Sequence, residues 1–142
     1  MKELNSGGNP HEDAKEARKR FNTIVEPVFL NKNFRRLNKR NQILINDETK
    51  SVVHVTSAPS QLKTYNDFKV KVKKYSLKEY EGYSNYVLFT RDYNEWKDKN
   101  TYQSTLKKVM SLPKVTGVAT GLGHLTDVLS SIETNDKFYM IK

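Results

Sequence analysis

The sequence predicts an α+β fold: a mainly antiparallel sheet of five to six strands, two packed amphipathic helices and a basic N-terminal helix. Residues 42–46 and 50–56 are two apolar runs separated by turn residues, which is typical of a hairpin. In 67–75, apolar and basic residues alternate, as they do in a strand with one buried face. From Leu125 to Ile132, apolar residues recur at the spacing of an amphipathic helix.

The size and composition of the chain favour one compact domain. Its 142 residues are 36% hydrophobic and 29% charged, which suits a single core. Residues 1–9 are expected to form a flexible tail, because Ser6 to Asn9 offer nothing to bury, and 10–142 are expected to form the domain. The absence of cysteine excludes disulfides, thiolate zinc sites and a cysteine nucleophile.

The N-terminal helix is predicted to begin at Pro10, with Asn9 as its cap. Acidic residues follow at its start and basic ones at its end, as the helix dipole favours. Its apolar stripe is thin, so we expect weak docking; the stripe consists of Ala14, Ala17 and Phe21. Beyond this helix, residues 28–30 are predicted to form a short strand and 34–37 a single helical turn.

The rest of the chain alternates strands and helices. Strand 67–75 places Lys69, Lys71 and Lys73 on its outer face. The other expected elements are a turn or short helix over 77–82, a strand buried on both faces over 84–90, a helix from Asn100 or Thr101 to Pro113, a strand over 114–119, a turn at 121–123 and a closing strand over 137–141.

Positive charge is concentrated in two segments. Residues 15–40 hold nine cations and two acids, and 63–78 hold six lysines and one acid, in a chain of net charge +9. Clustered cations bind polyanions by releasing condensed counterions, and arginine can grip phosphate with two hydrogen bonds. A solvated surface is the alternative. The predicted nucleic-acid contacts are Arg18, Lys19, Arg20, Arg35, Arg36, Lys39, Arg40, Lys69, Lys71 and Lys73.

Aromatic residues surround the lysine strand. If their rings were exposed, they would stack on the bases of a single strand; packing in the sheet is the stronger alternative, because tyrosine suits strands and cores. The residues concerned are Tyr65, Phe68, Tyr75, Tyr80, Tyr83, Tyr86, Phe89, Tyr93 and Trp96. No run typical of an RNA-recognition motif occurs.

No residue set identifies an enzyme, and no metal site or cofactor is expected. Glu95 and Lys97, with Asp67 or Asp92, only faintly match the acid-and-lysine set of magnesium-dependent nucleases. The three histidines, His11, His54 and His124, do not have metal-ligand spacing. Gly117, Gly121 and Gly123 lack the lysine and serine or threonine of a phosphate loop, so they are interpreted as turn residues.

No membrane association is expected. The first eight residues lack the apolar run of a signal peptide, and the uncharged stretch 115–126 is too short to span a bilayer. We therefore expect a cytoplasmic protein, or one inside a virion if a phage encodes it.

Three functions fit these observations. The first is a non-enzymatic protein that contacts the nucleic-acid backbone with little sequence preference, DNA being favoured over RNA. The second is a structural assembly protein, such as an internal phage capsid component whose basic face meets packaged DNA or a protein shell. The third is an inhibitor or adaptor that binds an acidic protein surface. Composition does not separate them, and whether the chain forms a homo-oligomer stays open.

Overall fold

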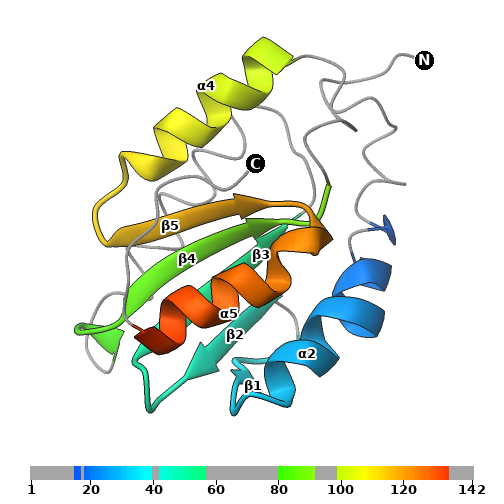
Figure 1. Ribbon diagram of the computed structural model, residues 1–142, viewed down its shortest axis with the longest axis vertical. Helices are drawn as coiled ribbons and strands as arrows, with labels where there is room; N and C mark the ends of the chain where they lie inside the picture. Colours follow the sequence, from blue (N-terminus) through cyan, green and yellow to red (C-terminus); the bar gives the residue numbers. More distant parts are fainter. Residues whose placement is uncertain (1–14, 17, 40–41, 57–79, 92–98, 135–142) are drawn as a thin grey trace.

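Among the residues that the structure describes, five strands form one mixed sheet in the order β1-β2-β3-β4-β5. The computed structural model describes residues 15–16, 18–39, 42–56, 80–91 and 99–134 (Figure 1). Within them the α+β class is confirmed. The strands are β1 (Arg35–Arg36), β2 (Ile43–Asn46), β3 (Ser51–Thr56), β4 (Ser84–Phe89) and β5 (Val115–Thr120).

The prediction of a mainly antiparallel sheet is wrong. β1, β2 and β3 pair antiparallel, but β3 with β4 and β4 with β5 pair in parallel. Two neighbouring strands can run parallel only if the chain between them crosses back to the end of the sheet where the first strand began. Helix α4 (Lys99–Met110) lies in the crossover between β4 and β5. The segment between β3 and β4, residues 57–83, is far longer than a hairpin turn.

Helices cover both faces of the sheet. On one face, Tyr86 and Leu88 of β4 pack against apolar side chains of α5 (Leu125–Thr134) and of the helical segment that precedes β1. Val87 and Phe89 point to the opposite face, where they pack against Leu106 and Val109 of α4. Strand β4 is thus buried on both faces, as predicted.

The helical segment before β1 comprises residues 15–16 and 18–30 and is called the N-terminal helix below. Its middle is a π-helical turn, η1 (Phe21–Val25), and its end is α2 (Glu26–Leu30). Pro27 cannot donate a hydrogen bond to the Thr23 carbonyl, and the Thr23 hydroxyl donates to the Lys19 carbonyl at 2.7 Å. Both features disturb regular helical bonding. The wider turn keeps three buried side chains on one face: Phe21, Val25 and Phe29.

Residues 28–30 therefore end a helix, and the prediction of a strand there is wrong. The Phe34 amide donates to the Phe29 carbonyl at 3.1 Å and the Asn33 amide to the Leu30 carbonyl at 3.3 Å. Asn33 has φ 70°, so these bonds form a Schellman motif with asparagine in the left-handed position. The chain then continues into β1, so the helical turn predicted over 34–37 is also wrong.

The hairpin is confirmed, and an asparagine organises its turn. Asn46 Oδ1 accepts hydrogen bonds from the amides of Glu48 at 2.8 Å and Thr49 at 3.1 Å, which is the turn geometry that asparagine favours. Asn46 Nδ2 also donates to the Lys32 carbonyl at 3.2 Å. The same residue therefore shapes the hairpin and ties it to the end of α2.

Other predicted elements are confirmed where the structure describes them. Helix α5 buries Leu125, Val128, Leu129 and Ile132, the four residues of the predicted stripe. Helix α4, strand β5 and the turn after Tyr80 also lie where expected. The tail 1–9, the helix start at Pro10, strand 67–75 and the closing strand 137–141 lie outside the described residues.

Gly121, between β5 and α5, has a backbone conformation that favours glycine. Its φ is 93° and its ψ is 147°, and its amide donates to the Phe89 carbonyl at 2.7 Å. We expect Gly121→Ala to lower the free energy of unfolding by about 1–2 kcal/mol, because a Cβ is strained at positive φ. Gly123→Ala is the control, since an added Cβ there meets nothing within 4 Å. Equal urea midpoints for the two variants would contradict the expectation.

Candidate nucleic-acid interface

The structure describes six of the ten predicted contact residues. Arg40 and the lysines Lys69, Lys71 and Lys73 lie outside the described residues. The other six fall into two groups. Arg18, Lys19 and Lys39 are exposed on the surface. Arg20, Arg35 and Arg36 make intramolecular contacts with acidic side chains.

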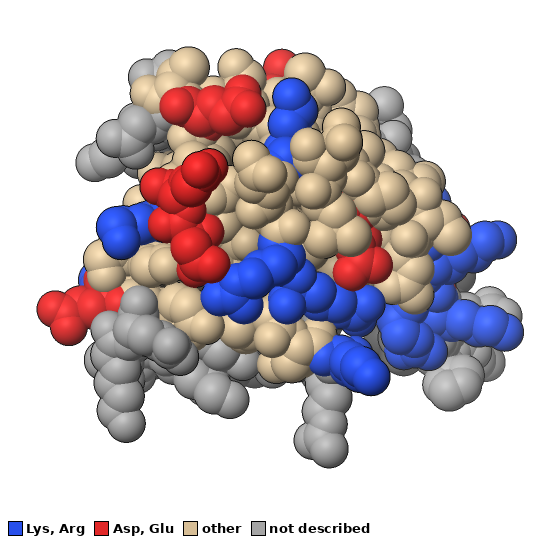
Figure 2. All heavy atoms as spheres, turned by 90° about the horizontal axis from the view of Figure 1, so that it is seen from below, with Lys and Arg blue, Asp and Glu red and all other residues tan. Residues whose placement is uncertain are grey.

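Exposed cations follow the N-terminal helix and the segment beyond it. Lys15, Arg18 and Lys19 are spaced three and four residues apart, so they share one face of the helix. Lys32 and Lys39 are exposed before and after β1. Figure 2 views the end of the molecule where β1 and the end of α2 lie, and shows Lys and Arg side chains in a band beside a group of acidic ones.

Arg20 joins the N-terminal helix to the sheet. Its Nε lies 3.0 Å from Glu16 Oε2, one helical turn away, and its Nη1 donates to the Thr90 carbonyl at 2.9 Å. Thr90 directly follows β4. The guanidinium thus holds the helix against the carboxyl end of a central strand, which is a structural role.

Arg36 also has a structural role. Its guanidinium carbon lies 4.9 Å from the centroid of the Phe21 ring, its Nη1 lies 3.6 Å from Glu26 Oε2, and its Nη2 donates to the Lys39 carbonyl at 3.4 Å. A cation over an aromatic ring gains electrostatic stabilisation. Arg36 therefore links β1 to the N-terminal helix.

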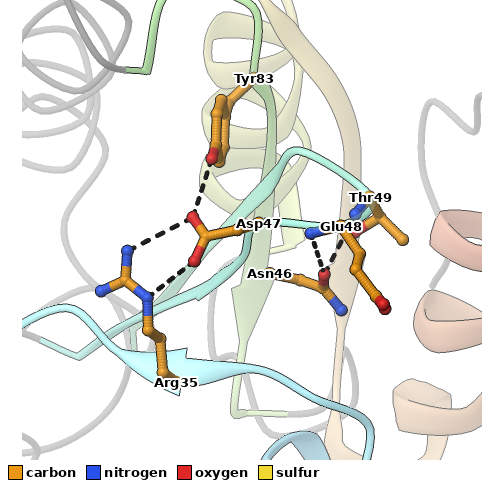
Figure 3. Close-up of polar contacts among 6 residues, drawn as sticks. All are labelled: Arg35, Asn46, Asp47, Glu48, Thr49 and Tyr83. Atoms are coloured by element: carbon orange, nitrogen blue, oxygen red, sulfur yellow. Dashed lines mark hydrogen bonds and ion pairs between the residues drawn. The ribbon is translucent and has the colours of Figure 1, made fainter.

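Arg35 forms a two-bond ion pair at the tip of the hairpin. Its Nε and Nη2 donate to Asp47 Oδ2 at 3.0 Å and Oδ1 at 3.3 Å, and the Tyr83 hydroxyl donates to Oδ1 at 2.8 Å (Figure 3). The hydrogen bonds from Arg35 and then Tyr83 lower the pKa of Asp47. The bond to Asp47 and partial burial raise the pKa of Tyr83.

Sequence reasoning missed Asp47 as a site residue, and it considered Tyr83 only as a candidate for base stacking. The antiparallel pairing of Arg35 with Ile45 places the arginine beside the hairpin turn, and Tyr83 approaches the same turn from the segment before β4. No local spacing connects these three residues, because strand pairing alone brings them together.

The described aromatic residues mostly pack inside the protein. Tyr86 and Phe89 are buried in the core, and burial raises the pKa of Tyr86. Tyr80 and Tyr83 are half-buried with their rings edge to face, 5.3 Å apart between centroids. The remaining predicted stacking residues, Tyr65, Phe68, Tyr75, Tyr93 and Trp96, lie outside the described residues.

Histidine and acidic residues form no metal site in the described parts of the chain. His54 is buried, with Nε2 donating to Asn85 Oδ1 at 2.8 Å, and His124 Nδ1 lies 3.3 Å from Asp127 Oδ2. The nuclease residues Asp67, Asp92, Glu95 and Lys97 fall outside the described ranges, as does His11. None of the described helices is long and apolar enough to cross a bilayer.

A groove of about 680 Å³ runs between α2 and α5. Pro27 and Val28 line one side and Leu129 and Ser130 the other, with Lys32 and Glu133 also in the lining. Three large apolar side chains of the N-terminal helix are also exposed: Ile24 by 41%, Val28 by 36% and Leu30 by 47%. Apolar surface of this kind is typical of contacts between proteins.

Comparison of the chain with protein-family models, with curated proteins and with solved structures finds no match.

Proposed function

We propose that this protein is a non-enzymatic basic protein that contacts the phosphate backbone of nucleic acid, DNA in particular, with little sequence preference. The observation that carries the proposal is the set of exposed cations on the N-terminal helix and beside β1, in a chain of net charge +9: Lys15, Arg18, Lys19, Lys32 and Lys39. Lysine and arginine on one exposed helix face suit backbone contacts, which position a protein without reading bases.

Two observations support electrostatic binding rather than stacking on bases. Lys15, Arg18 and Lys19 project from a helix that is anchored to the sheet by Phe21 and Arg20, so the cations are held on a fixed support. Tyr86 and Phe89 of β4 are buried in the core, so their rings do not face solvent, where a base could stack on them. We therefore expect affinity that falls steeply with salt.

The test is fluorescence anisotropy of a labelled 20-base-pair duplex, and of one of its strands, from about 50 to 300 mM salt. We expect log K to fall with log salt by several units of slope. The double variant Arg18→Gln/Lys19→Gln should reduce that slope by about one to two units, because about one unit is lost per phosphate contact.

The matched control is Lys107→Gln/Lys108→Gln, which removes two exposed neighbouring cations from α4 on the opposite side of the sheet. It lowers the net charge equally, so it measures the effect of overall charge. Equal losses in the two double variants would contradict an interface on the N-terminal helix. Absence of wild-type binding at 50 mM salt would exclude the proposed function.

The second candidate is a structural assembly protein, for example inside a virion. The exposed apolar residues of the N-terminal helix and the neighbouring groove favour it, and a second copy of the chain is the occupant we propose. Lys32 and Glu133 both line the groove, so a two-fold contact would set each against its opposite charge in the other copy. Concentration-dependent self-association that Val28→Glu abolishes, without any binding of DNA, would favour this candidate.

A further inference from the structure

Donors from two other parts of the chain converge on the carboxylate of Asp47. Arg35 comes from β1, Asp47 from the turn between β2 and β3, and Tyr83 from the segment before β4 (Figure 3). The guanidinium and the phenol supply three hydrogen bonds, at 3.0, 3.3 and 2.8 Å. Lys50 Nζ lies 5.6 Å from the centroid of the Tyr83 ring, which adds positive charge beside the same anion.

These donors have the chemistry of a phosphate site. The planar fork of arginine binds carboxylate and phosphate oxygens with the same two-bond geometry, and a phenol hydroxyl donates equally well to either anion. Like a carboxylate, a phosphodiester presents two oxygens on one atom that share one negative charge. Asp47 therefore occupies the position that a backbone phosphate would take.

The Asp47 carboxylate lies at the surface, where replacing its ion pair with Arg35 by another anion costs little free energy. The side chains of Arg35 and Asp47 are 50% and 55% exposed, and exposed ion pairs contribute little net stability because water and salt screen them. The hydrogen bonds that lower the pKa of Asp47 show that these donors favour a negative charge. An incoming phosphate would meet donors already arranged around an anion.

We infer that Asp47 is an internal competitor for a nucleic-acid phosphate: a backbone phosphodiester replaces its carboxylate on Arg35 and Tyr83, and Asp47 thereby weakens binding. This inference rests on the proposed function. It gives Arg35 a binding role that its ion pair with Asp47 conceals. The ligand chemistry is a phosphate group, and the source to which we assign it is the nucleic-acid backbone.

The test compares Asp47→Asn with Glu48→Gln in the duplex-binding assay at about 100 mM salt. Both changes remove one negative charge from the same exposed turn, but the Glu48 side chain points away from Arg35 (Figure 3). We expect Glu48→Gln to tighten binding about two- to threefold. Asp47→Asn should tighten it about tenfold and steepen the salt dependence by about one unit, because one further phosphate contact forms.

The gain must also depend on Arg35. In an Arg35→Gln background, Asp47→Asn should tighten binding no more than Glu48→Gln does. Equal gains from the two single variants, or a gain that persists without Arg35, would overturn the inference while wild-type binding still upheld the proposed function. If wild-type protein and all variants fail to bind the duplex, the proposed function fails and this inference with it. Melting temperatures check that each variant is folded.

A second measurement identifies the source of the phosphate. The ¹⁵N–¹H signal of Arg35 Nε is followed while Asp47→Asn protein is titrated with the duplex, or with inorganic phosphate at an equal phosphate concentration. A shift with the duplex that inorganic phosphate does not reproduce supports a nucleic-acid contact. An equal shift with both ligands, or a shift with inorganic phosphate alone, would overturn the assignment to nucleic acid.

Discussion

Phe29→Ala should lower the free energy of unfolding by about 3–5 kcal/mol, the usual cost of removing a fully buried phenylalanine. Phe29 is inaccessible to solvent, and its ring meets that of Phe34 edge to face with centroids 5.0 Å apart. Its carbonyl accepts the Phe34 amide in the Schellman motif. The same residue therefore packs the N-terminal helix on the sheet and supports the turn into β1.

Leu30→Ala is the matched control for this prediction. It also truncates a large apolar side chain of α2, but Leu30 is 47% exposed, so we expect a change below about 1 kcal/mol. Urea unfolding followed by circular dichroism gives both values. A loss of similar size in the two variants would mean that the N-terminal helix is not docked through Phe29.

The length of the buried face of this helix could not be predicted from its first residues alone. The apolar stripe predicted for this helix is thin and ends at Phe21, whereas in the structure it continues through Val25 and Phe29. Pro27 lies between these last two residues and interrupts the regular helical pattern. The π-helical turn keeps Phe21, Val25 and Phe29 on one face of the helix. Residues 28–30 look like a strand because they are apolar and follow proline, whereas the Asn33-Phe34 pair that ends the helix is a weaker pattern.

The hairpin and the helices α4 and α5 could be predicted because local patterns determine them. Asn46 sets the turn and periodic apolar residues set the helices. The parallel pairing could not be predicted by the same means, because it depends on which strands meet. The sequence does contain one indication of it, because a strand buried on both faces, followed by a helix and another strand, is typical of a parallel crossover.

The roles of the charged residues could not be predicted from the local sequence either. Their number is set by composition, but their roles depend on tertiary contacts. Arg20, Arg35 and Arg36 each contact an acid, from positions 4, 12 and 10 residues away in the sequence. Only the first pair has a spacing that predicts contact within a helix. A count of arginines therefore does not show which of them pair with an acid inside the protein, and Lys15, Arg18 and Lys19 are exposed on their helix.

The buried pair of His54 and Asn85 should show strong coupling in a double-mutant cycle. The two side chains are 1% and 0% exposed, and His54 Nε2 donates to Asn85 Oδ1 at 2.8 Å. We expect His54→Leu and Asn85→Leu each to lower the free energy of unfolding by about 1–3 kcal/mol, since each strands a buried polar group of the other residue. Urea unfolding at neutral pH measures both losses.

The double variant should cost less than the sum of the single variants, because replacing both partners leaves neither polar group without the other. In the parallel ladder Asn85 faces Val52 and His54 faces Val87, so the hydrogen bond joins diagonal neighbours on β3 and β4. Sliding β4 by two residues would keep every side chain on its face. In one direction the slide sets Asn85 directly opposite His54, and in the other it separates the pair by four positions. The bond therefore disfavours the slide that separates the pair, and additive losses would show that the two side chains are not coupled.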